Sequence, residues 1–303
     1  MRALVTGATG FVGSHLAQCL VAGGWKVHLI VRPESDLLPL NNISGVVTFH
    51  QHDGSTEGMQ QIVTQAKPDV VFHLASLALV QHQVKDIEPL ISSNILFATQ
   101  LAEAMTACGV SRLVNTGTYW QHFESRGYCP VNLYSATKQA FESILQFYLE
   151  TTPLKVITLK LFDTYGPGDP RPKLFTLLRK AAAEQITLAM SPGEQLIDLV
   201  YIDDVTDAFL VAADRLLAEV VEGHEEYAVT SGRPIELKEL VEIYGRVMSK
   251  VIPICWGGRP YRLREVMVPW NRGMVLPGWL PKVGLEEGIR RMENFPPKCL
   301  LQT

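Results

Sequence analysis

Residues 1–165 alternate short apolar runs, rich in β-branched residues, with longer stretches in which apolar residues recur at helical spacing. This alternation predicts strands separated by crossover helices. The predicted strands are Arg2–Thr6, Lys26–Val31, Val46–His50, Val70–Leu74, Arg112–Asn115 and Lys155–Leu161. The predicted helices lie near Val12–Ala22, Gly58–Ala66, Pro89–Cys108 and Val131–Glu150. Because a crossover follows every strand before the last, the pattern predicts an α/β fold with a doubly wound parallel (Rossmann) sheet.

The pattern changes after residue 165. Residues 165–172 contain three prolines and two glycines, a turn cluster that is typical of a domain boundary. Beyond it the sequence predicts helices near Lys173–Glu184, Val205–Leu217 and Leu237–Met248, and one short strand at Tyr227–Thr230. We therefore expect one domain over residues 1–165 and, over residues 166–303, mostly a second domain that is smaller and less regular. Tyr227–Thr230 is the segment that could return to the main sheet.

Composition excludes several classes of protein. Of 303 residues, 47% are hydrophobic, which is normal for a globular chain, and 19% are charged, which is below the usual share of about 25%. These fractions argue against disorder. A net charge of −4 gives no basic footprint for a nucleic-acid partner. The most apolar stretch, residues 70–80, is too short to span a membrane. No C-x-x-C occurs, so we expect the reduced thiols of a cytoplasmic protein at Cys19, Cys108, Cys129, Cys255 and Cys299.

A glycine-rich loop, T-G-A-T-G-F-V-G, follows the first predicted strand and opens the first predicted helix. Gly7 allows the tight turn, Gly10 lets the backbone approach a pyrophosphate, and Gly13 lets helix and strand pack closely. The helix N-terminus presents unpaired N–H groups to phosphates. The loop therefore predicts a dinucleotide cofactor.

The end of the second strand bears on which dinucleotide binds. NAD enzymes usually place Asp or Glu there for the ribose 2′-OH, whereas this chain has Arg32 after Val31. A guanidinium suits the 2′-phosphate of NADP, so we expect NADP (NADPH), with Glu34 keeping NAD open as the alternative. Asp53 could accept from the adenine amino group, or could simply initiate a turn before Gly54.

A tyrosine and a lysine stand four residues apart early in a predicted helix. The spacing places the Tyr134 phenol and the Lys138 ammonium on one face. A free tyrosine, with a pKa near 10, is a poor acid–base catalyst at neutral pH, and a nearby ammonium favours the phenolate. We therefore expect Lys138 to lower the pKa of Tyr134 and to bind the nicotinamide ribose.

Two clusters could suggest a metal ion, and we expect neither to bind one. His50 and His52 alternate on a strand end without a carboxylate or thiol partner, which favours a solvated strand face. Asp203, Asp204 and Asp207 begin a predicted helix, where carboxylates satisfy free N–H groups and the helix dipole.

The motifs T-G-x-x-G-x-x-G and Y-x-x-x-K together resemble the extended short-chain dehydrogenase/reductases (the NAD-dependent epimerase/dehydratase family), which act on nucleotide-linked sugars. Residues 69–76, 161–167, 198–205 and 277–288 also resemble segments of that family. The resemblance implies cofactor contacts from Gly7, Thr9, Gly10, Phe11, Val12, Gly13, Arg32, Asp53, Gly54, Leu74, Ala75, Ser76, Asn94, Thr116, Tyr134 and Lys138.

The same resemblance implies a Ser or Thr at the end of the fifth strand that binds the reacting sugar oxygen. Thr118 fits this position, and Thr116 lies nearer the cofactor or faces the core. The implied chemistry is hydride transfer from NADPH to a ketone carbon, with Tyr134 protonating the developing alkoxide and Thr118 orienting it.

Residues beside the implied catalytic triad, which consists of Thr118, Tyr134 and Lys138, indicate the reaction type. Sugar 4,6-dehydratases carry Asp-Glu after the catalytic Thr, where this chain has Tyr119-Trp120. Epimerases commonly retain tightly bound NAD, against which Arg32 argues. Residues 115–122 and 130–138 look most like nucleotide-sugar 4-ketoreductases of the CDP-abequose and CDP-paratose synthase type, in deoxysugar biosynthesis. An NAD-dependent nucleotide-sugar epimerase and a non-catalytic NAD(P)-binding sensor remain the alternatives.

Two departures from the family affect the substrate site. Asp163 occupies a substrate-binding position where many relatives have Asn, and Ile197 stands where many have Arg. In those relatives both positions often bind the substrate diphosphate, which a carboxylate and an isoleucine cannot do. We therefore expect Arg259 and Arg262, with Arg264 nearby, to hold the substrate diphosphate; the alternative is that they are surface arginines. Relatives commonly form homodimers through the helices near Pro89–Cys108 and Val131–Glu150.

Overall fold

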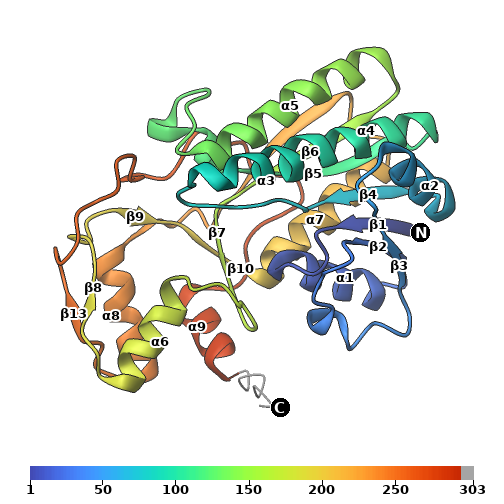
Figure 1. The fold of residues 1–303 in the computed structure, drawn as a ribbon. Helices are drawn as coiled ribbons and strands as arrows, with labels where there is room; N and C mark the ends of the chain where they lie inside the picture. Colours follow the sequence, from blue (N-terminus) through green and yellow to red (C-terminus); the bar gives the residue numbers. More distant parts are fainter. Residues whose placement is uncertain (295–303) are drawn as a thin grey trace.

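A seven-stranded parallel sheet forms the centre of the computed structural model, which describes residues 1–294 (Figure 1). The strand order is β11-β6-β5-β4-β1-β2-β3, and every neighbouring pair is parallel. The chain reverses direction across the sheet between β1 and β4, which confirms the doubly wound fold. The strands are β1 (Arg2–Thr6), β2 (Lys26–Val31), β3 (Thr48–Gln51), β4 (Val70–His73), β5 (Arg112–Thr118), β6 (Lys155–Leu161) and β11 (His224–Val229).

Helices cover both faces of this sheet, which explains why its central strands read as almost continuous apolar runs. One face packs against α1 (Phe11–Ala22) and α7 (Ile202–Leu217). The other face packs against α2 (Thr56–Ala66), α4 (Phe97–Ala107) and α5 (Leu133–Thr151). In Figure 1 these two layers lie below and above the sheet.

A second group of elements lies beside one end of the sheet, at the lower left of Figure 1. It has its own apolar core, which includes Leu178, Leu240, Tyr244 and Ile289. Its elements are β7 (Asp163–Tyr165), α6 (Leu174–Glu184), β8 (Leu188–Ala189), β9 (Leu196–Ile197), β10 (Leu199–Tyr201), β12 (Ile235–Glu236), α8 (Leu237–Met248), β13 (Ile254–Cys255) and α9 (Leu285–Asn294). Because α7 and β11 pack into the main layers, the chain crosses between the two groups more than once. The domain division at residue 165 stays a prediction.

Several element boundaries differ from the sequence-based expectation. The single helix expected over Pro89–Cys108 is divided into α3 (Ile87–Ile91), a π-helical turn (Ser92–Leu96) and α4. β5 continues past Asn115 to Thr118, because its pairing with β6 extends that far. β3 begins two residues later than expected. Short 3₁₀ turns occupy Leu38–Leu40, Val84–Asp86, Tyr119–Gln121 and Phe123–Ser125.

The clusters that could suggest a metal have other roles. His52 is buried and its Nε2 donates to Ser55 O (3.1 Å), so the expected solvated strand face is wrong for this side chain. Asp204 accepts from the backbone N–H groups of Lys282 (3.0 Å) and Val283 (2.9 Å). Its carboxylate therefore fastens the C-terminal segment instead of capping α7, whose N-cap Tyr201 makes no side-chain cap. Within residues 1–294, no group of three or more His, Cys, Asp or Glu could hold a metal ion.

Two further observations concern the described part of the chain. None of its helices combines the length and apolar character needed to cross a bilayer. Cys19, Cys108, Cys129 and Cys255 are free thiols, and Cys299 lies outside the described residues.

A histidine pair joins β2 to β3. His28 Nδ1 lies 2.9 Å from His50 Nε2, and the two rings stack 5.2 Å apart. Burial lowers the pKa of both groups, and for His28 the facing His50 adds to the effect. The folded state therefore takes up these protons less readily than the unfolded chain, whose histidines titrate near pH 6.5.

We expect the free energy of unfolding to fall as the pH drops below about 6.5, by about 1.4 kcal/mol for each unit of lowered pKa. His50→Gln should weaken this pH dependence, since it leaves one titrating ring of the pair. Urea unfolding of both proteins at pH 5.5 and 7.5 measures the difference. Equal losses of stability on acidification in the two proteins would contradict a contribution from the pair.

Candidate functional site

The glycine loop turns directly from β1 into α1. Gly7 has φ of +71°, and a Cβ built there would lie 2.6 Å from the Ala75 backbone nitrogen. A Cβ on Gly13 would overlap the carbonyl oxygen of Gly7. At Gly10, in contrast, the nearest atom to a built Cβ is Gly7 O at 3.2 Å. The loop thus forms a cradle. There is no room for a side chain at Gly7 or Gly13, whereas the surface of the loop at Gly10 is open.

The Thr6 hydroxyl fixes the segment that follows β4, which forms the second wall of this cradle at the switch point between β1 and β4. Thr6 Oγ1 accepts from the backbone N–H groups of Leu74 (3.2 Å) and Ala75 (3.1 Å). Its own hydrogen is therefore donated to His73 Nδ1, 2.9 Å away. His73 is then neutral, and its burial together with the nearby Lys138 holds its pKa well below the ordinary value.

Asn94 clamps the loop that follows β4. Its amide donates to Leu77 O (3.0 Å) and Thr137 Oγ1 (2.9 Å), and its carbonyl accepts from Leu77 N (2.7 Å) and Ser76 Oγ (3.2 Å). The residue is 1% exposed, on the π-helical turn. The structure therefore places Asn94 behind Ser76, as a support of the cradle wall; direct contact with a cofactor stays a prediction.

Tyr134 and Lys138 stand on the first turns of α5. Asn132 caps this helix by accepting from Ser135 N (2.9 Å), while Ser135 Oγ accepts from Asn132 N (3.1 Å). Desolvation raises the pKa of the Tyr134 phenol to about 12, although a hydrogen bond with Ser76 and the charge of Arg171 act to lower it. The expected lowering by Lys138 is therefore not what the structure shows, because burial outweighs the favourable charges.

Lys138 is itself 1% exposed. Burial lowers the pKa of its ammonium to about 8, against the opposing effect of Glu142 and with a further lowering by Lys160. At neutral pH the pair therefore consists of a protonated phenol and a cationic ammonium. This is the state of charge that can donate a proton at one atom and bind hydroxyl groups at the other.

The two candidate threonines differ in their surroundings. Thr118, at the end of β5, is 7% exposed, and its hydroxyl accepts from Trp120 N at 3.3 Å. The Thr116 hydroxyl is a buried oxygen without a partner among the described residues. The roles of both residues stay predictions.

The region next to β2 and β3 leaves the dinucleotide type open. Arg32 Nε lies 3.3 Å from Glu34 Oε1, and both side chains are mostly exposed. Such an exposed pair is worth about 1 kcal/mol or less, so a bound phosphate could displace Glu34. Asp53 Oδ1 accepts from the backbone and the hydroxyl of Ser55, both at 2.8 Å, which lowers the pKa of the carboxyl. These bonds form the turn that is expected if Asp53 initiates a turn and does not bind adenine; Gly54, which follows it, has a φ of +92°.

Sequence reasoning missed a buried ionic cluster behind the triad. Lys160 Nζ lies 2.7 Å from Glu142 Oε2 and 3.0 Å from Glu226 Oε2. Gln121 donates to Glu142 Oε2 (3.1 Å) and accepts from Thr118 N (3.0 Å). The available signal was a lysine in the middle of an apolar strand and a glutamate one helical turn after Lys138.

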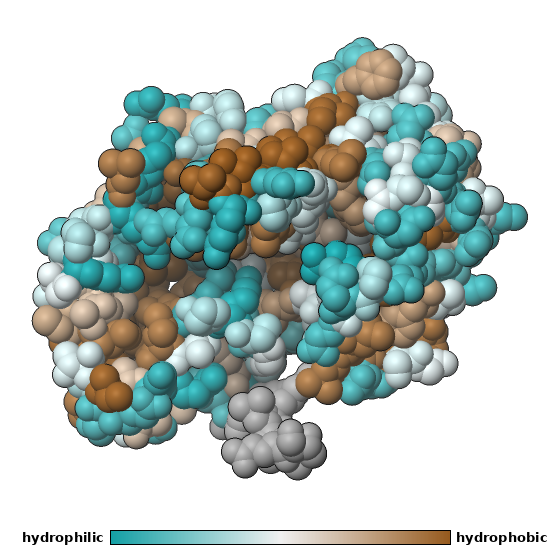
Figure 2. Space-filling model, in the orientation of Figure 1, coloured by the Kyte–Doolittle hydropathy of each residue, from teal (hydrophilic) through white to brown (hydrophobic). Residues whose placement is uncertain are grey.

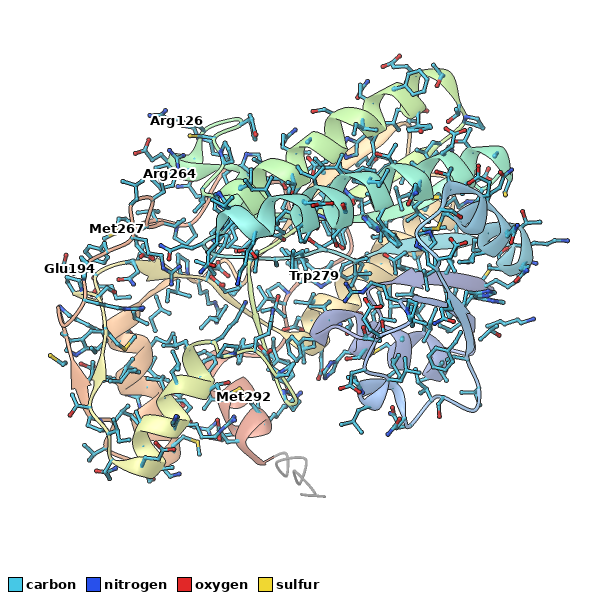
Figure 3. All side chains as sticks on the ribbon, viewed as in Figure 1. Arg126, Glu194, Arg264, Met267, Trp279 and Met292 are labelled. Carbon is cyan, nitrogen blue, oxygen red and sulfur yellow. The ribbon has the colours of Figure 1, made fainter. Side chains whose placement is uncertain are left out.

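A cleft of about 1270 Å³ opens between the main layers and the smaller group of elements. Its lining includes Tyr119 and Leu133, the chain neighbours of Thr118 and Tyr134, but not these two predicted catalytic side chains. Figure 2 shows this face hollowed between the two parts, and Figure 3 shows Arg264 and Met292 on opposite sides of the hollow. The residues that line the cleft include Tyr119, Trp120, Asn132, Leu133, Asp163, Lys173, Arg259 and Arg262.

The polar groups of the cleft include one fixed pair. The Tyr119 hydroxyl donates to Asp163 Oδ2 at 2.9 Å, and burial with this carboxylate holds the pKa of Tyr119 well above its ordinary value. Arg262 lies 4.0 Å from Glu265, a weak contact that leaves the guanidinium available. The lining of the cleft thus includes guanidinium groups, which suit phosphate groups, and aromatic side chains, which suit a ring.

Comparisons with known proteins agree with this geometry. A family model described as the NAD dependent epimerase/dehydratase family matches residues 3–225. The CDP-abequose synthase of Yersinia pseudotuberculosis is 28% identical over 272 residues, covering 89% of this chain and 92% of that protein. The UDP-glucose 4-epimerase of Mycolicibacterium smegmatis is 29% identical over 313 residues, covering 97% and 98%. The UDP-glucose 4-epimerase structure from Thermus thermophilus, in complex with NAD, has a TM-score of 0.82 at 26% identity, covering 96% and 97%.

Proposed function

Since this chain belongs to the NAD-dependent epimerase/dehydratase family, we propose that it uses NADPH to reduce the 4-keto group of a nucleotide sugar. The substrate we propose is a CDP-4-keto-deoxyhexose, and the reaction belongs to deoxysugar biosynthesis. Similarity to a CDP-abequose synthase supports this substrate class.

One observation carries the proposal: a phenol that stays protonated stands on α5, the helix that packs against the turn following Thr118. The pKa of Tyr134, about 12, keeps its proton available throughout the neutral range. Tyr119 and Trp120 follow Thr118, so the acid–base pair that an elimination of water needs is not provided at these positions. Proton donation to an alkoxide is the step that these groups support best.

The roles of the individual side chains follow. The bound nicotinamide supplies the hydride chemistry. Tyr134 donates its proton to the oxygen of the former ketone, Thr118 orients that oxygen, and Lys138 binds the ribose hydroxyls. Arg259 and Arg262, which line the cleft, hold the substrate diphosphate, and Asp163 accepts from a sugar hydroxyl.

The assay that tests the proposal measures oxidation of NADPH by its absorbance, with a CDP-4-keto-deoxyhexose as substrate and the matching UDP and dTDP sugars in parallel. We expect turnover of at least one 4-keto sugar, with NADPH consumed in equal amounts. No turnover with any of them would exclude the reductase.

An NAD-dependent nucleotide-sugar epimerase is the second candidate. Similarity to the UDP-glucose 4-epimerase of Mycolicibacterium smegmatis supports it, as does the exposed Arg32–Glu34 pair, whose carboxylate could serve a ribose 2′-OH. Extraction of the nucleotide bound to the purified protein distinguishes the two: stoichiometric, non-exchanging NAD favours the epimerase. Bound nucleotide without any turnover would instead indicate a sensor.

Arg32→Asp tests the proposed cofactor. Loss of a guanidinium–phosphate contact is expected to weaken NADPH binding by about 10- to 100-fold and to leave NADH binding nearly unchanged. Titration of the intrinsic fluorescence with each dinucleotide gives both Kd values. Glu34→Gln is the matched control, because it frees Arg32 and should preserve or strengthen NADPH binding. Equal weakening of both dinucleotides by Arg32→Asp would remove the basis for NADP.

We further propose that the protein works in the cytoplasm as a homodimer. Four free thiols among the described residues support the compartment. Exposed apolar side chains at Ile87 and Ile91 on α3 and at Leu96 on the π-helical turn, in the region where Figure 2 shows a brown band, support an interface through this helical segment.

A further inference from the structure

The buried ionic cluster behind the triad is largely shielded from solvent. The Lys160 side chain has no exposed surface, and that of Glu142 is 5% exposed. Lys160 Nζ donates to both oxygens of the Glu142 carboxylate, at 2.9 and 2.7 Å. Gln121 satisfies the same carboxylate from the other side, at 3.1 Å, and Glu226 provides a second, partly exposed counter-charge.

Charges of both signs in this cluster act on Lys138. Glu142 is on the same face of α5, one turn beyond Lys138. The titratable groups around Lys138 are Tyr134 and Glu142 on α5, the neutral His73 on β4, Lys160 on β6 and, further out, His224 and Glu226 on β11. Glu142 favours the charged form of Lys138, whereas Lys160 and burial disfavour it.

The stability of the fold does not by itself explain why Glu142 and Lys160 form a buried ion pair. Desolvation of both ions costs about as much as their attraction returns, so an apolar pair of similar volume would often serve the fold equally well. The Glu142–Lys160 pair, however, lies one helical turn from an ammonium that must stay charged in a desolvated position. The carboxylate can support that charge only if Lys160 does not remove its whole effect.

We propose that the Glu142–Lys160 pair is a positioning device that sets the charge of Lys138, with Glu142 holding Lys138 as an ammonium and Lys160 limiting that effect. The inference rests on the proposed role of Lys138 in binding the cofactor ribose. Glu142 and Lys160 act through Lys138 and not on the substrate.

Opposite effects of two single substitutions provide the test. The ¹³Cε signal of Lys138, assigned with a Lys138→Arg protein, is titrated by NMR in the full-length protein without added substrate. Glu142→Gln is expected to move the midpoint down by about one pH unit, and Lys160→Met to move it up. Glu150→Gln makes the same charge change at the exposed end of the same helix and should leave the midpoint unchanged.

The double substitution Glu142→Gln with Lys160→Met is the control for misfolding of the single variants, because it removes both members of the ion pair between α5 and β6. Its midpoint should return close to that of the unmodified protein. Shifts of the same sign in both single variants, or none in either, would overturn the proposal.

The pH profile of turnover is a separate reading. Because Lys138 acts as an ammonium, kcat/KM falls as the pH rises through its pKa, and this alkaline limb should move in the same direction as each NMR midpoint. Midpoints that move as expected in a protein without turnover would support the role of the pair and reject the proposed reaction. A limb that stays fixed while the midpoints move would overturn the link to catalysis.

Discussion

Tyr134→Phe is expected to lower kcat by about 10²- to 10⁴-fold, the usual contribution of a positioned acid. The substitution removes one hydroxyl from a side chain that is partly buried on α5. Without the phenol, we expect the alkoxide to take its proton from water, which is not held in position. Cofactor affinity should change little, because the cradle of Gly7 and Gly13 is untouched.

Single-turnover and steady-state oxidation of NADPH measure the loss, and dinucleotide titration measures the affinity. Tyr128→Phe is the matched control, since Tyr128 is 53% exposed on the turn before α5 and should keep full activity. Full activity in Tyr134→Phe would reject the phenol as the acid. A loss of dinucleotide affinity in step with kcat would point to disturbed packing instead.

The parts that the sequence predicts well depend on neighbours along the chain. The glycine loop is such a case, because a strand, a tight turn and a helix N-terminus follow one another within a few residues. The spacing of Tyr134 and Lys138 is another, since one helical turn separates them. Alternating apolar runs likewise predict the doubly wound sheet without any knowledge of strand order.

The parts that were missed depend on contacts between distant segments. Lys160 reads as an ordinary strand residue until β6 lies beneath α5 and brings it to Glu142. Asp204 reads as a helix cap until the segment at Val283 arrives to donate to it. The π-helical turn at Asn94 accompanies the four hydrogen bonds of that side chain, which periodicity does not register.

The pKa of Tyr134 shows a further limit. The sequence places an ammonium one turn away and so favours a lowered pKa, yet it carries no information on how much water reaches the phenol. Burial decides the sign, and it raises the pKa to about 12. The consequence for chemistry is favourable to reduction, where a proton donor is needed, and less so to an oxidation that begins with a phenolate.

Gly13→Ala is expected to affect both stability and cofactor binding, because a Cβ at this position overlaps a backbone oxygen that cannot rotate away. That oxygen, Gly7 O, also accepts from Gly10 N at 3.0 Å, so any displacement opens the turn. Overpacking of this kind costs about 1–3 kcal/mol in the free energy of unfolding. Since the N–H groups at the start of α1, which this turn positions, are the proposed phosphate site, dinucleotide affinity should fall by about tenfold or more.

Gly45→Ala separates this effect from the general consequences of replacing glycine, since a Cβ at Gly45 has no neighbour within 4 Å. It should leave the urea midpoint and both dinucleotide Kd values unchanged. If Gly13→Ala lowered stability while dinucleotide affinity stayed intact, the turn would be needed for packing alone, and the phosphates would have to bind elsewhere. Loss of both in Gly13→Ala, with neither lost in Gly45→Ala, would support the cradle as the phosphate site, because the Gly7 oxygen that a Cβ at Gly13 displaces belongs to the turn that precedes α1.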